Sequence, residues 1–327
     1  MRSLAPLAMW HAGVDRLAMW TEDRKARTPQ RFSVGPTGEL GCFGALPELP
    51  APPAGPGPWT APSPRARHRG DLMRVHLFPA EGRSAGTAIL VPPWKTEGVA
   101  LVSGWISLLA RAGRDVWLVV PPHHLERTAP GARSGEGFVS LDLAELRATF
   151  EQLVLEVRVV AALAARRGPV DLVGLSLGGL ASALAATVTP ELSRVALVAP
   201  PADLAAVLDE TAIGARYRTL AHRAGTPLPA AGALREAFAA FDPTRRPRPA
   251  ADLLVAVGRY DAIALPRGAA ALARAWGATA SFYRRGHLTL LFACRALRRD
   301  VSRFLAVPRQ TTAGAPAMAG IPGTLPA

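Results

Sequence analysis

The chain has 327 residues, of which 49% are hydrophobic and only 19% are charged. This composition provides for a packed core and excludes a disordered or collagen-like protein. The 38 basic and 25 acidic residues give a net charge of +13, which alone would suggest a nucleic-acid or anionic membrane partner. Only Lys25 and Lys95 are lysines, however, and the arginines are scattered rather than clustered. The pattern therefore argues against a nucleic-acid partner and gives only weak support to a membrane surface.

The N-terminal region, residues 1–67, is predicted to form a helix followed by a proline-rich leader. One side of this helix would carry Leu4, Leu7, Trp10, Val14 and Leu17. A histidine interrupts the apolar stretch and two charged residues end it, so the segment is a poor secretory signal. No run of about 20 uncharged apolar residues predicts a membrane-spanning helix. We therefore expect a cytoplasmic protein.

The folded domain is expected at residues 68–306. It is preceded by the proline-rich stretch 47–64, which predicts an extended linker or wrapping segment. It is followed by residues 307–327, which predict a disordered tail. Cys42 and Cys294 make neither a disulfide framework nor a zinc motif, which fits a reducing compartment and leaves a single bridge between them open.

Within the domain, short apolar runs of strand length alternate with helical stretches. Strands are expected at residues 72–78, 87–91, 116–120, 170–173, 195–198, 253–257 and 281–283. Helices are expected at residues 99–112, 141–167, 179–187, 267–276 and 288–305. Continuous apolar strands separated by helices predict an α/β fold with a mainly parallel central sheet flanked by helices. Residues 202–249 lack strands and contain alanine-rich helical pieces, which predicts an inserted helical lid.

A glycine-rich turn follows the predicted strand at residues 170–173. The sequence GLSLGG, residues 174–179, matches the G-x-S-x-G nucleophile elbow and precedes a predicted helix. The sharp turn exposes the serine, and the N–H groups of the following helix point at developing negative charge. Ser176 is therefore the candidate nucleophile, because a glycine-rich turn with an uninvolved serine is the less favoured interpretation.

A serine needs a base, and in this architecture the acid and the histidine follow it along the chain. His287 comes after the last predicted strand, whereas His222 lies within the predicted lid. Asp261 leaves the strand at 253–257 at its carboxyl end and would orient the imidazole. Asp252 precedes that strand, and Asp242 lies on the lid side. The predicted triad is therefore the elbow serine with His287 and Asp261.

An oxyanion hole needs two backbone N–H donors. Leu177, the residue after the nucleophile, is the first candidate. The loop after the strand at 87–91 would supply the second, but Pro92 and Pro93 have no N–H. Trp94 is therefore the second candidate donor, and Lys95 is the alternative.

Two further histidines, His123 and His124, follow a strand at the sheet edge where ligands bind in open α/β folds. They are candidate substrate contacts, although solvated loop histidines are equally expected. No ligand spacing around them predicts a metal site. Neither the dinucleotide nor the P-loop pattern is present, so no cofactor is expected.

The sequence resembles the α/β-hydrolase superfamily over residues 68–306. The resemblance rests on three segments that occur in this order: GLSLGG, GRYDAIALP and RRGH. Within it, the chain looks like the dienelactone-hydrolase-like esterases and peptidases. The strand-end segment LVPPW is similar to one in polyhydroxyalkanoate synthases, but those enzymes have a cysteine in the elbow where this chain has serine. The oxyanion loop also departs from the usual pattern, because Pro92-Pro93 stands in place of a His-Gly pair.

The resemblance implies an α/β-hydrolase fold and a serine hydrolase that cleaves a small-molecule carboxylic ester or thioester through an acyl-enzyme. An acyltransferase or peptidase on the same fold, and a non-catalytic binding protein of this fold, remain as alternatives. Surface association with a membrane or nucleic acid through the basic excess is a third hypothesis. The oligomeric state is not determined by these patterns.

Overall fold

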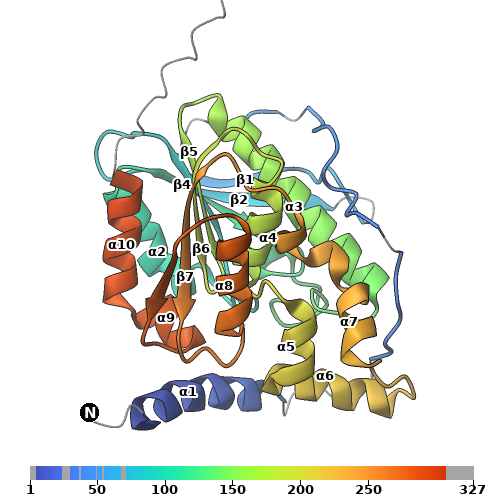
Figure 1. Cartoon of the computed structure of the whole chain (residues 1–327). Coiled ribbons are helices and arrows are strands. Elements are labelled where there is room, and N and C mark those ends of the chain that lie inside the picture. Colours follow the sequence, from blue (N-terminus) through green and yellow to red (C-terminus); the bar gives the residue numbers. More distant parts are fainter. Residues whose placement is uncertain are drawn as a thin grey trace, which may run out of the picture.

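The computed structural model describes residues 5–23, 30–36, 38–48, 50–53, 55–67 and 71–306. The predicted disordered tail at 307–327 and the side chain of Leu4 lie outside the described residues. Figure 1 shows a central sheet with helices on both sides and the N-terminal helix α1 (Ala5–Asp23) beneath it.

The described residues form one sheet of eight strands in the order β1-β2-β4-β3-β5-β6-β7-β8. The strands are β1 (Gly57–Pro62), β2 (Leu72–Phe78), β3 (Thr87–Val91), β4 (Asp115–Val120), β5 (Val170–Leu175), β6 (Leu192–Val198), β7 (Asp252–Gly258) and β8 (Ala280–Tyr283). The pairs β1–β2 and β2–β4 are antiparallel, and every other pair is parallel. The predicted α/β class with a mainly parallel sheet is confirmed.

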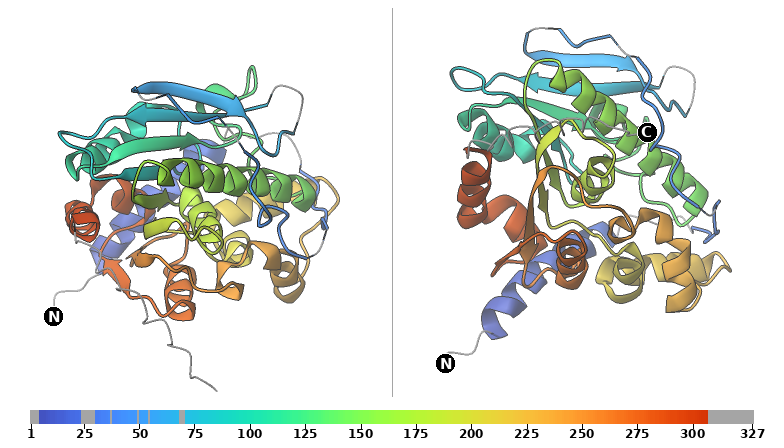
Figure 2. Two further views of the ribbon diagram at one scale, coloured as in Figure 1. Left: turned by 90° about the horizontal axis from the view of Figure 1, so that it is seen from above. Right: turned by 45° about the horizontal axis from the view of Figure 1, so that its top comes forward.

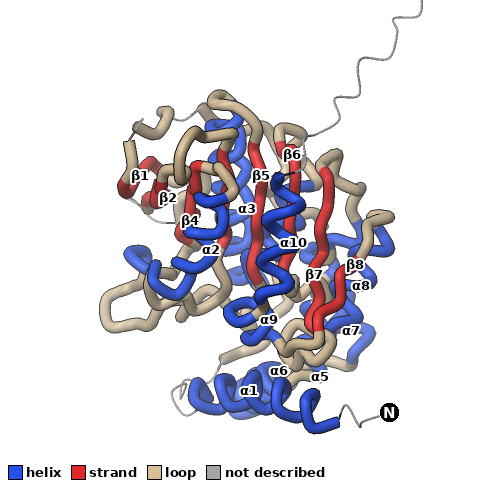
Figure 3. Tube along the Cα trace, turned by 90° about the vertical axis from the view of Figure 1, so that its left-hand side faces the viewer, coloured by secondary structure: helices blue, strands red, loops and turns tan. Residues whose placement is uncertain are grey.

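Helices cover both faces of the sheet, as the views in Figures 2 and 3 show. One face is covered by α2 (Val99–Arg111), α9 (His287–Ala293) and α10 (Arg295–Ala306). The other face is covered by α3 (Leu143–Ala165), α4 (Leu177–Ala186) and α8 (Pro266–Ala275). The parallel strands are joined through such helices because a parallel connection must cross over the sheet.

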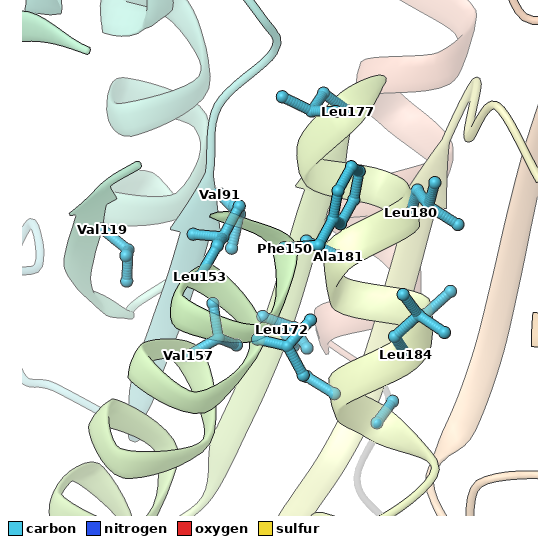
Figure 4. Packing of buried hydrophobic residues seen from close by; sticks show 14 of the residues in the cluster. Val91, Val119, Phe150, Leu153, Val157, Leu172, Leu177, Leu180, Ala181 and Leu184 are labelled. Atoms are coloured by element: carbon cyan, nitrogen blue, oxygen red, sulfur yellow. The ribbon is translucent and has the colours of Figure 1, made fainter. Parts of the chain in front are cut away.

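Alternate strand residues supply the two halves of the core. Leu90 and Val173 pack toward α2 and α10, whereas Ile89 and Leu172 pack toward α3 and α4. Figure 4 shows the second half, where side chains of α3 meet side chains of α4 above the strands. Each fully buried Leu or Ile side chain contributes about 1.5–3 kcal/mol, so this continuous burial holds the strand ends in place.

The segment predicted as an extended linker contains the edge strand β1. It pairs with β2, and it buries Trp59 and Ala61 while Pro58 and Pro62 take part in the same pairing. Proline is tolerated here because an edge strand has one side without a partner. The many prolines of this segment do not predict a strand, so the sequence alone did not indicate β1.

Two other expectations change in detail. The single helix expected at 288–305 is two helices, α9 and α10, because Cys294 between them has extended backbone angles, φ −95° and ψ 95°. The interval 202–249 contains α5 (Leu204–Glu210), α6 (Ala212–Arg223) and α7 (Ala231–Ala237) and no strand. That these helices act as a lid stays a prediction.

Both cysteine thiols are buried and free.

Helix α1 packs against α9, which lies above it in Figure 1, and against α6, which lies beside its right-hand end. The face that meets these helices is not the apolar one expected from the sequence. Trp10 and Leu17 are 58% and 61% exposed, whereas His11 and Asp15 are buried. Polar groups on the domain hydrogen-bond to these two residues, so the face of α1 that carries them lies against the domain. None of the described helices is long and apolar enough to span a membrane.

Candidate active site

Ser176 stands at the turn between β5 and α4, near the middle of the sheet. Its backbone has φ 52° and ψ −117°, a strained conformation for a residue with a side chain. Its N–H donates to the carbonyl of Val198 at 2.8 Å, and its side chain is nearly buried. The turn therefore holds the hydroxyl at the carboxyl edge of the sheet.

The glycines of GLSLGG are required by close packing around this turn. A Cβ on Gly174 would lie 2.4 Å from the hydroxyl of Ser182. A Cβ on Gly178 would lie 2.2 Å from the carbonyl oxygen of Val91. Both distances are far below van der Waals contact, so only glycine allows the elbow to lie this close to α4 and β3.

The structure brings Ser176, His287 and Asp261 together. His287 begins α9, and its Nε2 lies 2.8 Å from the Ser176 hydroxyl oxygen. Its Nδ1 lies 2.7 Å from Oδ2 of Asp261, which follows β7. The other carboxylate oxygen of Asp261 accepts the N–H groups of Ile263 and Ala264, at 2.8 and 2.7 Å. The carboxylate can only accept here, so Nδ1 of His287 carries the proton and Nε2 faces the serine as an acceptor.

The charges around His287 favour its acting as a base. Burial opposes the charged imidazolium, but the neighbouring carboxylates of Asp261 and Asp15 outweigh burial and raise the pKa of His287 above its usual value. A raised pKa makes the imidazole a better proton acceptor once it is neutral.

The rival residues are placed elsewhere. Asp242 accepts the backbone N–H and the hydroxyl of Thr244, and so caps a short 3₁₀ turn. Asp252 is exposed at the start of β7, the opposite end from Asp261, and His222 is exposed in the last turn of α6.

The loop after β3 is fixed by the loop after β4. The N–H of Lys95 donates to Nε2 of His124 at 3.1 Å, and the Trp94 indole N–H donates to the carbonyl of Gly135 at 2.8 Å. Lys95 has φ 63°, so its backbone is strained as well. Because the N–H of Lys95 is engaged, Trp94 is left as the candidate donor on this loop. The Trp94 ring lines the cavity beside Ser176.

The two histidines predicted as substrate contacts do not line that cavity. His124 is fully buried, and its Nδ1 lies 2.8 Å from the carbonyl of Pro122. Burial lowers the pKa of His124 to about 4, so its ring is neutral and accepts from Lys95. His123 has φ 62°, and a Cβ built on Gly137 would lie 3.2 Å from its Nδ1. His124 therefore braces the loop in this structure, and a substrate contact by His123 or His124 stays a prediction.

A cavity of about 110 Å³ opens beside the Ser176 hydroxyl. It is enclosed by Trp94, by the start of α3, by the elbow, by helices α5 and α6 and by Ile263. None of the described residues lining it is Asp, Glu, Lys or Arg. Burial raises the pKa of the lining phenol, Tyr217, to about 12, so this group stays neutral at ordinary pH. The lining of the cavity is therefore uncharged and mostly apolar.

Sequence reasoning missed Asp15, which is fully buried and accepts backbone N–H groups next to Asp261 and at the start of α9. Its Oδ2 accepts the N–H of His287 at 2.8 Å. The available signal was the spacing of His11 and Asp15, four residues apart and thus on one face of a helix that is otherwise mostly apolar.

No protein-family model matches the sequence, and a search of curated proteins found no relative. Solved structures do match. Acetyl xylan esterase 1 from Thermoanaerobacterium sp. JW/SL YS485 aligns with a TM-score of 0.53 and 13% identity over 77% of this chain and 88% of that one. Acylaminoacyl peptidase from Pyrococcus horikoshii aligns with a TM-score of 0.54 and 12% identity, over 79% of this chain and 41% of the peptidase chain.

A third match is 2,6-dihydroxy-pseudo-oxynicotine hydrolase, with a TM-score of 0.52 and 15% identity over 78% of this chain and 68% of that one. At such identities the similarity establishes the fold. Together with the sheet order, it shows that this chain has the α/β-hydrolase fold.

Proposed function

We propose that this protein is a serine hydrolase that cleaves a carboxylic ester, or a thioester, through an acyl-enzyme. The observation that carries the proposal is the hydrogen-bonded chain from Asp261 through His287 to Ser176, with distances of 2.7 and 2.8 Å. These are the contacts that a serine needs to become a nucleophile.

In the proposed mechanism, the Ser176 oxygen attacks the substrate carbonyl carbon and its proton passes to Nε2 of His287. The carbonyl oxygen becomes an oxyanion, which the backbone N–H groups of Leu177 and Trp94 bind. Asp261 stabilises the imidazolium through Nδ1–H. His287 then protonates the leaving group as its bond to carbon breaks, leaving an ester between the acyl group and Ser176.

Water completes the cycle. It attacks the acyl carbon, His287 accepts one of its protons, and the second tetrahedral intermediate releases the acid and the Ser176 oxygen, which takes the proton back from His287. An acceptor other than water would give acyl transfer by the same steps. An amide substrate would give peptidase activity.

The cavity favours an uncharged, apolar acyl group. A carboxylate or ammonium group placed in it would lose its hydration without gaining an ionic partner from the lining residues. An alkyl chain would instead bury apolar surface, at about 25 cal/mol per Å². We therefore propose small-molecule esters with apolar acyl chains as the substrate class.

A fluorophosphonate probe and a series of p-nitrophenyl esters from acetate to decanoate test this function. Wild type should become labelled and should hydrolyse the esters, and Ser176→Ala should lose labelling and reduce kcat by roughly 10⁴-fold or more. Ser103→Ala, which removes an exposed hydroxyl on α2, is the matched control and should behave as wild type.

The same series tests the acyl site. Ile213→Trp adds bulk to the cavity lining and should shift the preferred ester toward shorter chains while acetate hydrolysis changes little. Equal labelling of wild type and Ser176→Ala would reject Ser176 as the nucleophile, whereas a wild type that is neither labelled nor active on the esters would favour a non-catalytic binding protein. Faster cleavage of the matched p-nitroanilides would assign a peptidase instead.

A further inference from the structure

Helix α1 brings a buried carboxylate to the back of the candidate triad. Asp15 is fully buried, and its two oxygens accept three backbone N–H groups, one from the loop after β7 and two from the start of α9. Oδ2 accepts from His287 at 2.8 Å and from Ala262 at 3.3 Å, and Oδ1 accepts from Leu288 at 3.1 Å. Ala262 follows Asp261, so one side chain joins the backbone of the acid loop to the backbone of the base.

The fit of α1 against this region is close. A Cβ on Gly286 would lie 2.7 Å from Oδ2 of Asp15 and 2.9 Å from the carbonyl oxygen of His11. The ring of His11 stacks on Tyr260 with 5.8 Å between centroids, and its Nδ1 lies 2.8 Å from the Thr289 hydroxyl. Glycine before the catalytic histidine thus leaves the space that α1 occupies.

The first N–H groups of a helix have no partner within the helix. In α9 these groups belong to His287 and Leu288, and the residue before them, Gly286, has no side chain with which to cap them. Asp15 supplies the missing acceptor from a distant part of the chain. Hydrogen bonds to a charged acceptor are stronger than those between neutral groups, so the orientation of the first turn of α9 depends on this carboxylate.

We propose that Asp15 is a positioning residue for the reaction, one that holds the backbone of His287 and of the Asp261 loop at the spacing which the Ser176–His287–Asp261 chain requires. The inference rests on the proposed serine hydrolase function. Asp15 acts through the backbone and does not touch substrate. A segment outside the predicted hydrolase domain thereby sets the geometry of the active site.

The test compares Asp15→Ala and Asp15→Asn in the full chain, with kcat and KM measured on a p-nitrophenyl ester and thermal unfolding followed in parallel. Asp15→Ala should lower kcat about 10- to 100-fold and change KM less than twofold, because misplacement affects proton transfer more than binding. Asp15→Asn keeps one acceptor oxygen and should recover part of that loss. The rate of fluorophosphonate labelling should follow kcat.

Asp171→Asn is the matched control, since Asp171 is also a fully buried carboxylate but pairs with Arg114 at the other end of β5. It should lower the unfolding temperature and leave the kcat of the folded protein within twofold of wild type. Leu17→Ala, on the exposed side of α1, should change neither quantity.

A wild-type kcat in folded Asp15→Ala would overturn the inference, and so would a kcat in Asp15→Asn no higher than in Asp15→Ala. Failure of both variants to fold would also overturn it, because Asp15 would then be a determinant of folding. These results are separate from the test of the proposed function, which compares the labelling and ester hydrolysis of wild type with those of Ser176→Ala.

Discussion

The orientation of Asp261 makes its replacement by asparagine a sharp test of the triad. Oδ1 accepts two backbone N–H groups and Oδ2 faces Nδ1 of His287. In Asp261→Asn, the amide oxygen must stay on the side of the two N–H donors. The amide NH₂ group then faces Nδ1, so His287 is forced into the tautomer that carries its proton on Nε2, toward Ser176. That tautomer cannot accept the serine proton.

The size of the effect follows from the contacts. Restoring the active tautomer would cost the charge-assisted hydrogen bond, about 1.5–3 kcal/mol, and would place two buried donors against each other, about 1–3 kcal/mol more. The sum is about 2.5–6 kcal/mol, and since each 1.36 kcal/mol is a factor of ten, kcat should fall about 10²- to 10⁴-fold. KM should change little because Asp261 does not reach the substrate.

The measurement is the steady-state hydrolysis of a p-nitrophenyl ester, with thermal unfolding to count folded protein. Asp261→Ala is the control, since it removes the acceptor without imposing a tautomer. The kcat of Asp261→Asn should be no higher than that of Asp261→Ala, although asparagine has the closer shape. An Asn variant that keeps more than a tenth of the wild-type kcat would refute this account of the site.

Two further predictions concern the base and the elbow. His287 acts as a base only when neutral, and its neighbouring carboxylates raise its pKa above 6.5, so kcat/KM should fall on acidification with a midpoint above 6.5. A midpoint at or below 6.5 in a pH–rate profile would contradict this. Gly178→Ala places a methyl group 2.2 Å from the Val91 carbonyl oxygen and should destabilise the fold by about 1–3 kcal/mol in urea unfolding. Gly232→Ala in α7, with open space around the added methyl group, is the control and should not destabilise.

Much of the site follows from local sequence. The apolar run at 170–173 followed by GLSLGG predicts a strand, a tight turn and a helix, and the structure has β5, Ser176 and α4 there. Asp261 and His287 are predictable because each follows a predicted strand on the carboxyl side. This works because a parallel sheet places all such ends on one edge, so chain order alone brings the residues near one another.

Contacts between segments that are distant in the chain cannot be predicted from such local patterns. His124 has the same local setting as a ligand-binding histidine, and only the approach of the Lys95 loop makes it a brace. The strand β1 lies in a proline-rich stretch, and only its pairing with β2 identifies it. Local patterns say what a residue can do, whereas its partners depend on packing across the fold.

Local sequence is enough to predict the α/β class and the order of serine, acid and histidine, because these depend on hydrophobic periodicity and on turn residues next to one another in the chain. Which face of α1 is buried depends instead on contacts with the rest of the fold. Apolar periodicity indicated Trp10 and Leu17, but the buried face carries Asp15, because the N–H groups at the start of α9 need an acceptor that no nearby side chain provides.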